Sequence, residues 1–201
     1  MIKSKTYKIL SVLLSYPDLT MKKDINYAYK LLENDLIISS NNITIIKNLI
    51  QFINTSNLIY LQEYYVSIFD RKKDFSLYLF EHIHGDSRER GMAMIDLLDL
   101  YKKSNFILTQ TNELPDFLPL FLEYLSVIPE NKSALLLGEI INIIAVLGKR
   151  LKLINSEYYS IFELLESISP VKCDSKIITQ LISTFKSATS LDKEWEEPKI
   201  F

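Results

Sequence analysis

The chain has 201 residues, of which 48% are apolar and 24% are charged, and these values exclude wholesale disorder. Its formal net charge is −2, with 23 Lys and Arg residues against 25 Asp and Glu residues. This balance offers no basic surface to a phosphate backbone, so we expect no nucleic acid among the partners.

A single cysteine, Cys173, excludes an internal disulfide and a zinc site built from thiolates. We interpret it as a small, partly buried hydrophobe rather than a nucleophile. The basic start of the chain leads into an apolar stretch that ends at Tyr16 and Pro17 without the cleavage site of a secretory signal. The most apolar segment, 134–147, contains Glu139 and is too short to span a bilayer. We therefore expect a soluble, cytoplasmic protein with no direct membrane insertion.

Apolar residues recur at helical spacing along almost the whole chain, whereas the sustained alternation typical of strands is missing. Each apolar stripe covers one face of a helix and must be buried against another element. We therefore predict an all-α fold, a single-domain helical bundle of about eight or nine helices. In chain order, the stripes occupy residues 9–14, 28–32, 45–53, 60–69, 94–101, 118–125, 136–145, 161–168 and 177–185.

Polar residues and prolines indicate where several of these helices begin and end. Asp86 and Glu89 have the spacing of a capping box ahead of the fifth stripe. Pro115 and Pro119 are both tolerated if the sixth helix starts near Pro115, because a proline in the first turn loses no intrahelical hydrogen bond. We expect Pro129 and Pro170 to end helices.

The domain organisation follows from the same stripes. We assign residues 1–190 to one helical domain and residues 191–201 to a short, charged tail. Within that tail, Trp195 and Phe201 are candidate anchors for loose docking.

The most polar stretch, residues 81–91, holds both histidines and allows three interpretations. A metal site could use His82 and His84 with Glu81 and Asp86, although this pattern is a weak signal and no second cluster supplies a strong complement. Catalysis by His82 and Ser87 lacks a nucleophile elbow and an oxyanion loop. On residue chemistry alone we favour a structural loop held by charged side chains, since arginine binds carboxylates through paired hydrogen bonds. The side chains expected to form ion pairs are Glu81, Asp86, Arg88 and Arg90. The residues assigned to the loop and helix cap are Asp86, Ser87, Arg88, Glu89 and Arg90.

Two further segments are rich in apolar and aromatic residues. Residues 113–125 form either a core helix or a helix that lines an apolar groove with Asp116 and Glu123 at its rim. The aromatic residues of 60–69 suit a recognition surface as well as the edge of a core, because tyrosine combines an apolar ring with a polar tip. Periodicity does not separate these alternatives.

Four segments of the chain carry a recognisable signature. They are Tyr-Val-Ser-Ile-Phe-Asp-Arg at 65–71, Leu-Tyr-Leu-Phe-Glu-His-Ile-His-Gly-Asp-Ser-Arg-Glu-Arg-Gly-Met-Ala-Met at 77–94, residues 113–125 and Trp-Glu-Glu-Pro at 195–198. With these segments the chain resembles the NarJ family, the nitrate reductase delta-subunit chaperones within the wider TorD and DmsD group of redox-enzyme maturation chaperones. The resemblance covers roughly residues 60–128 and, more loosely, both ends. Two departures are Phe117, where the wider group often has histidine, and Ile68, where it has leucine.

The resemblance implies an all-helical chaperone that is not an enzyme and holds no cofactor or metal. It implies that the chain binds the amino-terminal segment of the nitrate reductase catalytic subunit, the apo-enzyme and, as further candidates, cofactor-delivery proteins. It also implies a role in molybdenum cofactor insertion and in delaying membrane attachment. The competing classes are a metal-dependent hydrolase that uses the histidine cluster and a scaffold subunit of the mature complex.

For client binding we expect helix-in-groove recognition, in which apolar anchors of a short amphipathic helix enter a groove and basic residues meet acids at its rim. The candidate client-binding residues are Tyr65, Phe69, Glu81, His82, Asp116, Leu118, Phe121, Leu122, Glu123 and Leu125.

Overall fold

A computed structural model describes residues 2–34, 38–84, 87–108, 113–176, 178, 179 and 182 of the chain. Within these residues the structure has ten α-helices and no strand, which confirms the predicted all-α fold. The predicted tail at 191–201 and most of the ninth stripe lie outside the described residues. The α-helices are α1 (Ile2–Leu14), α2 (Leu19–Glu33), α3 (Ser40–Thr55), α4 (Leu58–Tyr65), α5 (Leu79–His84), α6 (Glu89–Lys103), α7 (Leu118–Val127), α8 (Glu130–Glu139), α9 (Ile141–Leu153) and α10 (Tyr159–Ile168).

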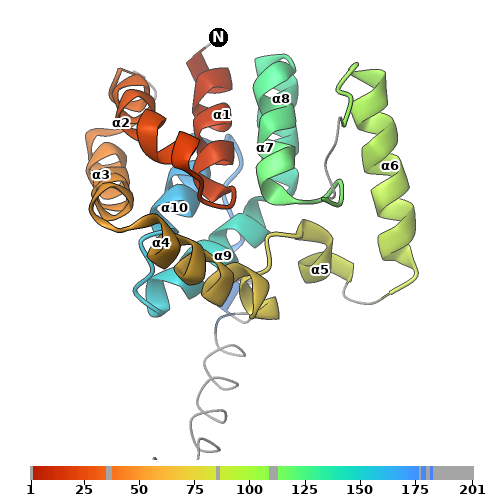
Figure 1. Cartoon of the computed structure of the whole chain (residues 1–201). Helices are drawn as coiled ribbons and strands as arrows, with labels where there is room; N and C mark the ends of the chain where they lie inside the picture. The colour runs from red at the N-terminus through yellow and green to blue at the C-terminus, as the bar shows by residue number, and fades with distance from the viewer. Residues whose placement is uncertain are drawn as a thin grey trace, which may run out of the picture.

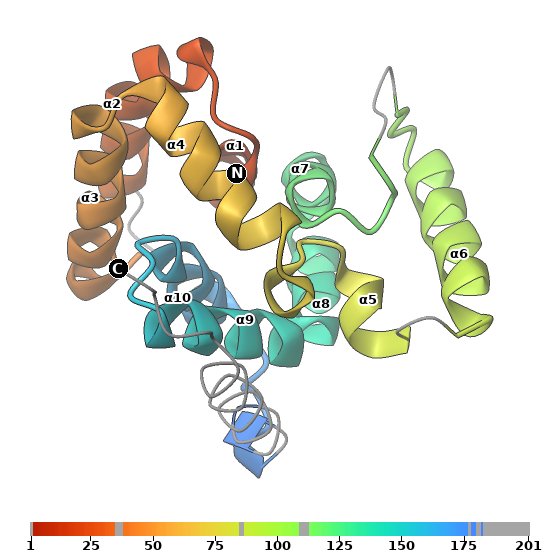
Figure 2. The ribbon, with the colours of Figure 1, turned by 60° about the horizontal axis from the view of Figure 1, so that its bottom comes forward.

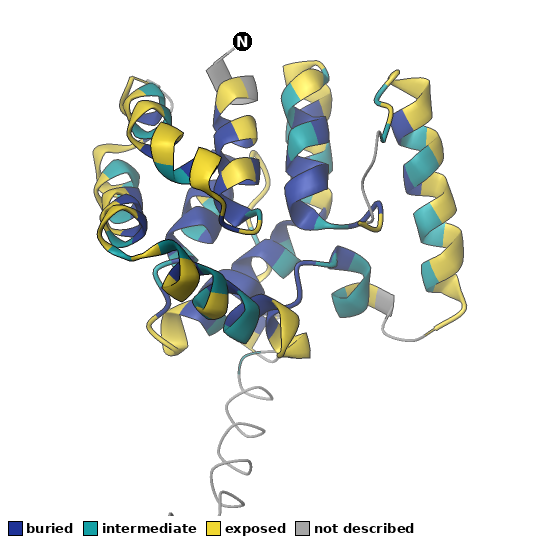
Figure 3. Cartoon of the chain, viewed as in Figure 1, coloured by how far each residue is buried: buried dark blue, intermediate teal, exposed yellow. Residues whose placement is uncertain are grey.

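Helix α1 lies at the centre of the arrangement and packs along α7 (Figure 1). On one side of α1, α2 and α3 form a pair, and α3 also contacts α10. Helices α9 and α10 pack on each other, and α6 stands at the opposite edge, where it contacts α5 (Figure 2). The buried residues concentrate where these helices face one another (Figure 3).

Local sequence explains where helices begin. The side chains of Asp18, Ser39 and Asn57 each accept a hydrogen bond from a backbone N–H in the first turn of α2, α3 and α4. Such caps satisfy backbone donors that the helix itself leaves unpaired. After α6 and α9, Asn105 and Asn155 adopt positive φ angles of 55° and 54°, a left-handed conformation that asparagine tolerates well.

Three boundaries differ from the predictions. Helix α6 begins at Glu89 with Arg88 as its N-cap, so Glu89 occupies the first helical position instead of the third, which a capping box with Asp86 requires. Helix α7 begins at Leu118 rather than near Pro115, although Pro119 does lie in its first turn. Pro129 and Pro170 follow the ends of α7 and α10, as predicted.

Two predicted helices are also divided differently. The stripe at 136–145 is split between α8 and α9, because Ile140 leaves the helical conformation at φ −99° and ψ 3°. The stripe at 60–69 covers α4 and a π-helical turn, Val66–Asp70, which is followed by a short 3₁₀ turn, Lys73–Phe75. The split and the unpredicted α5 raise the number of helices above the predicted eight or nine.

None of the helices in the described part of the chain combines the length and apolar character needed to cross a bilayer. Cys173 is half-buried, and its thiol donates a hydrogen bond to Glu166 over 3.3 Å. Burial, followed by this neighbouring carboxylate, raises the pKa of the Cys173 thiol, which disfavours the nucleophilic thiolate. This environment agrees with the interpretation of Cys173 as a small, partly buried side chain.

Two glycines provide a test of how closely the helices pack. A Cβ added at Gly148 of α9 would lie 2.8 Å from the Cβ of Phe162 in α10, whereas one added at Gly91 of α6 would meet nothing within 4 Å. We expect Gly148→Ala to lower the free energy of unfolding by about 1–3 kcal/mol through overpacking. Gly91→Ala should raise it by about 0.5–1 kcal/mol, because alanine favours a helix. Urea unfolding midpoints should move in opposite directions; an unchanged midpoint for Gly148→Ala would contradict the close approach of α9 and α10.

Candidate functional site

A short backbone pairing joins two segments that the sequence places far apart. The N–H of Leu118 donates to the carbonyl of Leu77 over 2.8 Å, and the N–H of Leu79 donates to the carbonyl of Asp116 over 3.0 Å. Tyr78 and Phe117 therefore lie opposite each other in an antiparallel bridge, with ring centroids 5.3 Å apart. This pairing fixes the starts of both α5 and α7.

Next to this bridge is a cavity of about 420 Å³, which we call the aromatic–acidic cavity. Its apolar part is held by aromatic contacts: the ring of Tyr65 lies 4.9 Å from that of Phe69 and 5.7 Å, edge-on, from that of Tyr16. The Tyr65 hydroxyl donates to the carbonyl of Leu14 over 2.9 Å, so this buried ring is fixed to the end of α1. The cavity is lined by Ser15, Tyr16, Tyr65, Phe69, Asp70, Leu77, Tyr78, Glu113 and Phe117.

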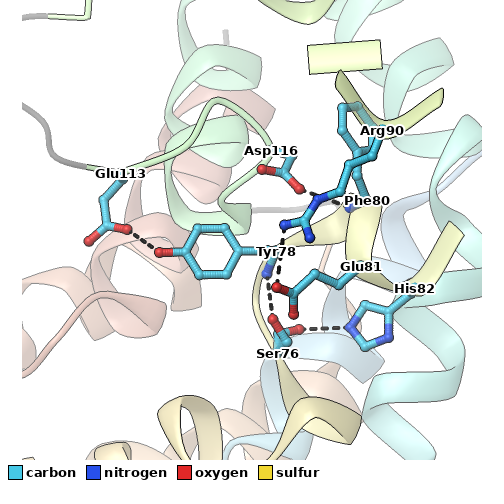
Figure 4. Close-up of polar contacts among 8 residues, drawn as sticks. All are labelled: Ser76, Tyr78, Phe80, Glu81, His82, Arg90, Glu113 and Asp116. Carbon is cyan, nitrogen blue, oxygen red and sulfur yellow. Dashed lines mark hydrogen bonds and ion pairs between the residues drawn. The ribbon is translucent and has the colours of Figure 1, made fainter. Parts of the chain in front are cut away.

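The polar part of the cavity is acidic. The Tyr78 hydroxyl donates to Glu113 over 2.6 Å (Figure 4). Asp70 is the second carboxylate in the lining. Burial, followed by the charge of Glu113, raises the pKa of Asp70. Among the described residues that line the cavity, none is Lys or Arg. A cationic group entering the cavity would relieve the repulsion between the two carboxylates and would be stabilised there.

Asp116 is not among the residues that line the cavity, and it does not lie at a rim. It is fully buried, and its carboxylate accepts a hydrogen bond from the N–H of Phe80 over 3.0 Å. Burial raises the pKa of Asp116, and the hydrogen bond from Phe80 and the nearby charge of Arg90 oppose that rise. The Asp116 side chain therefore holds the start of α5 onto the loop before α7, which corrects the prediction of a rim position.

Comparison with known proteins gives the family. The family model of the nitrate reductase delta subunit matches residues 39–162. The chain belongs to the nitrate reductase delta subunit family.

Its relatives within that family are named as assembly chaperones and not as catalysts. The nitrate reductase molybdenum cofactor assembly chaperone NarJ of Escherichia coli K12 is 33% identical over 195 residues, which cover 96% of this chain and 82% of the relative. The NarW protein of the same strain is also named as a nitrate reductase molybdenum cofactor assembly chaperone. It is 32% identical, and the match covers 96% of this chain and 81% of NarW. The corresponding NarJ of Bacillus subtilis 168 is 31% identical, and the match covers 80% of this chain and 85% of that protein.

A solved structure supports the fold. The crystal structure of an Archaeoglobus fulgidus protein described as a redox enzyme maturation protein superposes with a TM-score of 0.59 at 21% identity, over 81% of this chain and 90% of that one. This similarity agrees with the predicted TorD- and NarJ-like architecture.

In this delta-subunit family member, Arg90 in the first turn of α6 forms one of the predicted ion pairs. The guanidinium of Arg90 lies 3.3 Å from the carboxylate of Glu81 and close to Asp116 (Figure 4), and the N–H of Arg90 donates to the carbonyl of Ser87 over 3.2 Å. Ser87, Arg88 and Glu89 are exposed, and Asp86 lies outside the described residues. Arg90 therefore attaches the start of α6 to α5.

His82 also has a structural environment. Its Nε2 atom lies 2.8 Å from the carbonyl oxygen of Ser76 (Figure 4). Burial lowers the pKa of His82, which favours a neutral ring that donates this hydrogen bond. In the part of the chain that the structure describes, no three His, Cys, Asp or Glu side chains gather to hold a metal ion, and the side chain of His84 lies outside that part.

The predicted groove along α7 is not open. Leu118, Leu122 and Leu125 are fully buried and Phe121 is 4% exposed, because this face of α7 packs against α1. Glu123 is half-buried and forms an ion pair with Lys8 of α1. These residues join α7 to α1 rather than lining an accessible surface, so the prediction of a groove along α7 is corrected.

Of the candidate client-binding residues, Tyr65 and Phe69 are the two that line the aromatic–acidic cavity. The other seven lining residues were absent from the candidate set. Four of them, Asp70, Tyr78, Glu113 and Phe117, stand in or beside the quoted motifs, where their acidic and aromatic character was a usable signal. Tyr16 carried no such signal in the sequence, because only the fold brings the residues after α1 next to Tyr65.

The buried carboxylate of Asp116 generates the first prediction for this site. Asp116→Ala leaves the N–H of Phe80 without its acceptor, so we expect the free energy of unfolding to fall by about 1–3 kcal/mol. The matched control is Asp99→Ala, which removes an exposed carboxylate paired with Lys102 and should cost no more than about 0.5 kcal/mol. Chemical denaturation of both variants makes the comparison, and equal losses would argue against a structural role for Asp116.

A second prediction uses the lowered pKa of His82. In the folded chain the pKa of His82 lies below its ordinary value of 6.5. At a pH between the folded and the ordinary pKa, the unfolded chain therefore binds more protons than the folded chain. The free energy of unfolding consequently falls as the pH drops below 6.5. His82→Gln cannot take up this proton and should lose less stability between pH 7.5 and pH 5.5. Urea titrations at both pH values measure the difference, and parallel losses in the two proteins would refute a buried, neutral His82.

Proposed function

We propose that this protein is a system-specific chaperone of respiratory nitrate reductase, which assists molybdenum cofactor insertion and the assembly of the membrane-bound complex. The observation that carries this proposal is membership of the delta subunit family across residues 39–162, together with relatives named as molybdenum cofactor assembly chaperones. A role in holding an immature enzyme requires a binding surface and no reacting groups, and the cavity described above is of that kind.

We further propose that the chaperone binds the amino-terminal segment of the catalytic subunit in the aromatic–acidic cavity. Tyr65 and Phe69 provide an apolar surface for a buried side chain, and Asp70 and Glu113 provide carboxylates for a basic one. An amphipathic segment with a basic residue beside its apolar anchors satisfies both parts. The same surface would also engage this segment within the apo-enzyme.

The cavity chemistry is compatible with binding that can be reversed. Three or four buried apolar anchors contribute roughly 1.5–3 kcal/mol each, and ordering the segment consumes several kcal/mol of that total. A net free energy of about −8 kcal/mol corresponds to a dissociation constant near micromolar. An assembly factor needs such an affinity because it must release its client once the cofactor is in place.

In this proposal the protein acts in the cytoplasm, before the client attaches to the membrane, and cofactor-delivery proteins are further partners. The competing metal-dependent hydrolase gains no support from the described residues. Its candidate His82 contacts a backbone carbonyl and is not presented to a substrate, and Asp86 and the side chain of His84 lie outside the described residues.

Isothermal titration with a peptide of the first ~20 residues of the catalytic subunit, long enough for one or two helices, tests the proposal. Wild-type protein should bind near the micromolar range. Glu113→Gln keeps an oxygen for the Tyr78 hydroxyl but removes the charge, so it should weaken binding by about threefold to tenfold and reduce its salt dependence. Glu139→Gln, a change of the same kind at an exposed position at the end of α8, should bind like wild type. An absence of heat with wild-type protein would refute client binding.

A further inference from the structure

A second and larger hollow lies between α1 and α2, and we call it the α1–α2 groove. It encloses about 680 Å³, a size within the usual range for ligand pockets. Apolar side chains from both helices make up most of its lining. The lining residues are Lys8, Ile9, Val12, Leu13, Ser15, Tyr16, Asp18, Thr20, Met21, Asp24, Ile25, Tyr27, Ala28 and Leu31.

The apolar rim of this groove is exposed. Val12 is 38% exposed, Tyr16 is 52% exposed and Tyr27 is 67% exposed, while Leu13 and Ile25 beneath them are buried. Single exposed apolar residues are common on protein surfaces and need no explanation, but three around one apolar hollow are typical of an interaction site.

The charges around the groove favour a basic partner. Asp18 and Asp24 contribute two carboxylates to the lining, and one Asp18 oxygen accepts a hydrogen bond from the N–H of Met21. Lys8 is the one cationic residue among the lining residues, and it forms an ion pair with Glu123 of α7. The unbalanced charge in the groove is therefore negative, which matches an incoming segment that carries basic residues.

The α1–α2 groove also adjoins the aromatic–acidic cavity. Ser15 and Tyr16 line both hollows, and the ring of Tyr16 meets that of Tyr65 edge-on at 5.7 Å. Tyr16 therefore stands between a mostly apolar groove with two acids and a cavity that has an apolar part and two acids. Both hollows combine apolar side chains with carboxylates, on either side of one exposed ring.

We propose that the α1–α2 groove holds a continuation of the same client segment, as an amphipathic helix with basic residues opposite Asp18 and Asp24. This inference rests on the proposed function, because the occupant of the aromatic–acidic cavity is the client. One segment then occupies two compartments that Tyr16 separates. Apolar side chains at positions i, i+3, i+4 and i+7 of the helix enter the groove, while the part beyond Tyr16 enters the cavity.

A first experiment measures binding of the peptide of the first ~20 residues, which is long enough to form one or two helices, to variants of the groove. Ala28→Glu places a charge in the apolar lining and should weaken binding about tenfold or more. Asp24→Asn should weaken it about threefold and reduce its salt dependence. The control is Ile59→Glu, because Ile59 is 70% exposed on α4 and lines neither hollow. Unfolding midpoints of all three variants should match that of wild type.

A second experiment identifies the occupant directly. A photo-crosslinking amino acid at position 12, with position 59 as the control site, is activated in the presence of saturating client peptide, and mass spectrometry identifies the attached chain. Attachment of the peptide at position 12 supports the proposal. Attachment of a second copy of this chain, attachment of residues 183–201 of the chain itself, or no attachment overturns it.

The two proposals fail in different ways. If wild-type protein binds the peptide and Glu113→Gln weakens that binding, while Ala28→Glu and Asp24→Asn bind normally, the groove is not a client site but the proposed function stands. If wild-type protein does not bind the peptide, both proposals fail.

Discussion

The backbone pairing of residues 77–79 with residues 116–118 is the constraint on which the rest of the site depends. Two hydrogen bonds and the carboxylate of Asp116 hold the start of α5 against the start of α7. With these starts fixed, Tyr78 and Phe117 face each other and Glu113 reaches the Tyr78 hydroxyl. A buried carboxylate is costly unless it is hydrogen-bonded, and here the N–H of Phe80 and the nearby charge of Arg90 offset part of that cost.

Helix α1 connects this pairing to the rest of the fold. One of its faces packs along α7, where the Ser11 hydroxyl donates to the carbonyl of Pro119 over 2.7 Å and Lys8 pairs with Glu123. Another face meets α2 and forms one side of the α1–α2 groove. At its end, the carbonyl of Leu14 accepts the hydroxyl of Tyr65. A single helix therefore stabilises the core and also determines the shape of both hollows.

The fold class could be predicted from the sequence because helical periodicity is a local property, visible in almost every segment. The boundaries of the helices were harder to predict from the sequence. The apolar residues from Leu136 to Ala145 form one continuous stripe, and their spacing does not indicate the break at Ile140. The site was only partly predictable for a related reason. Periodicity shows that α7 has an apolar face, but burial against α1 rather than exposure in a groove is decided by tertiary contacts.

The residues with the most conspicuous chemistry in the sequence became supports in the structure. His82 contacts the carbonyl of Ser76 and Arg90 contacts Glu81, so the most polar stretch orients α5 and α6. The hollows are instead lined by tyrosines, aliphatic side chains and a few acids, which attract no notice in a search for catalytic motifs. This division is physically reasonable for a protein that holds another chain. Recognition of an amphipathic segment needs apolar area and complementary charge on a rigid frame, whereas reactive groups in the same place would serve no purpose.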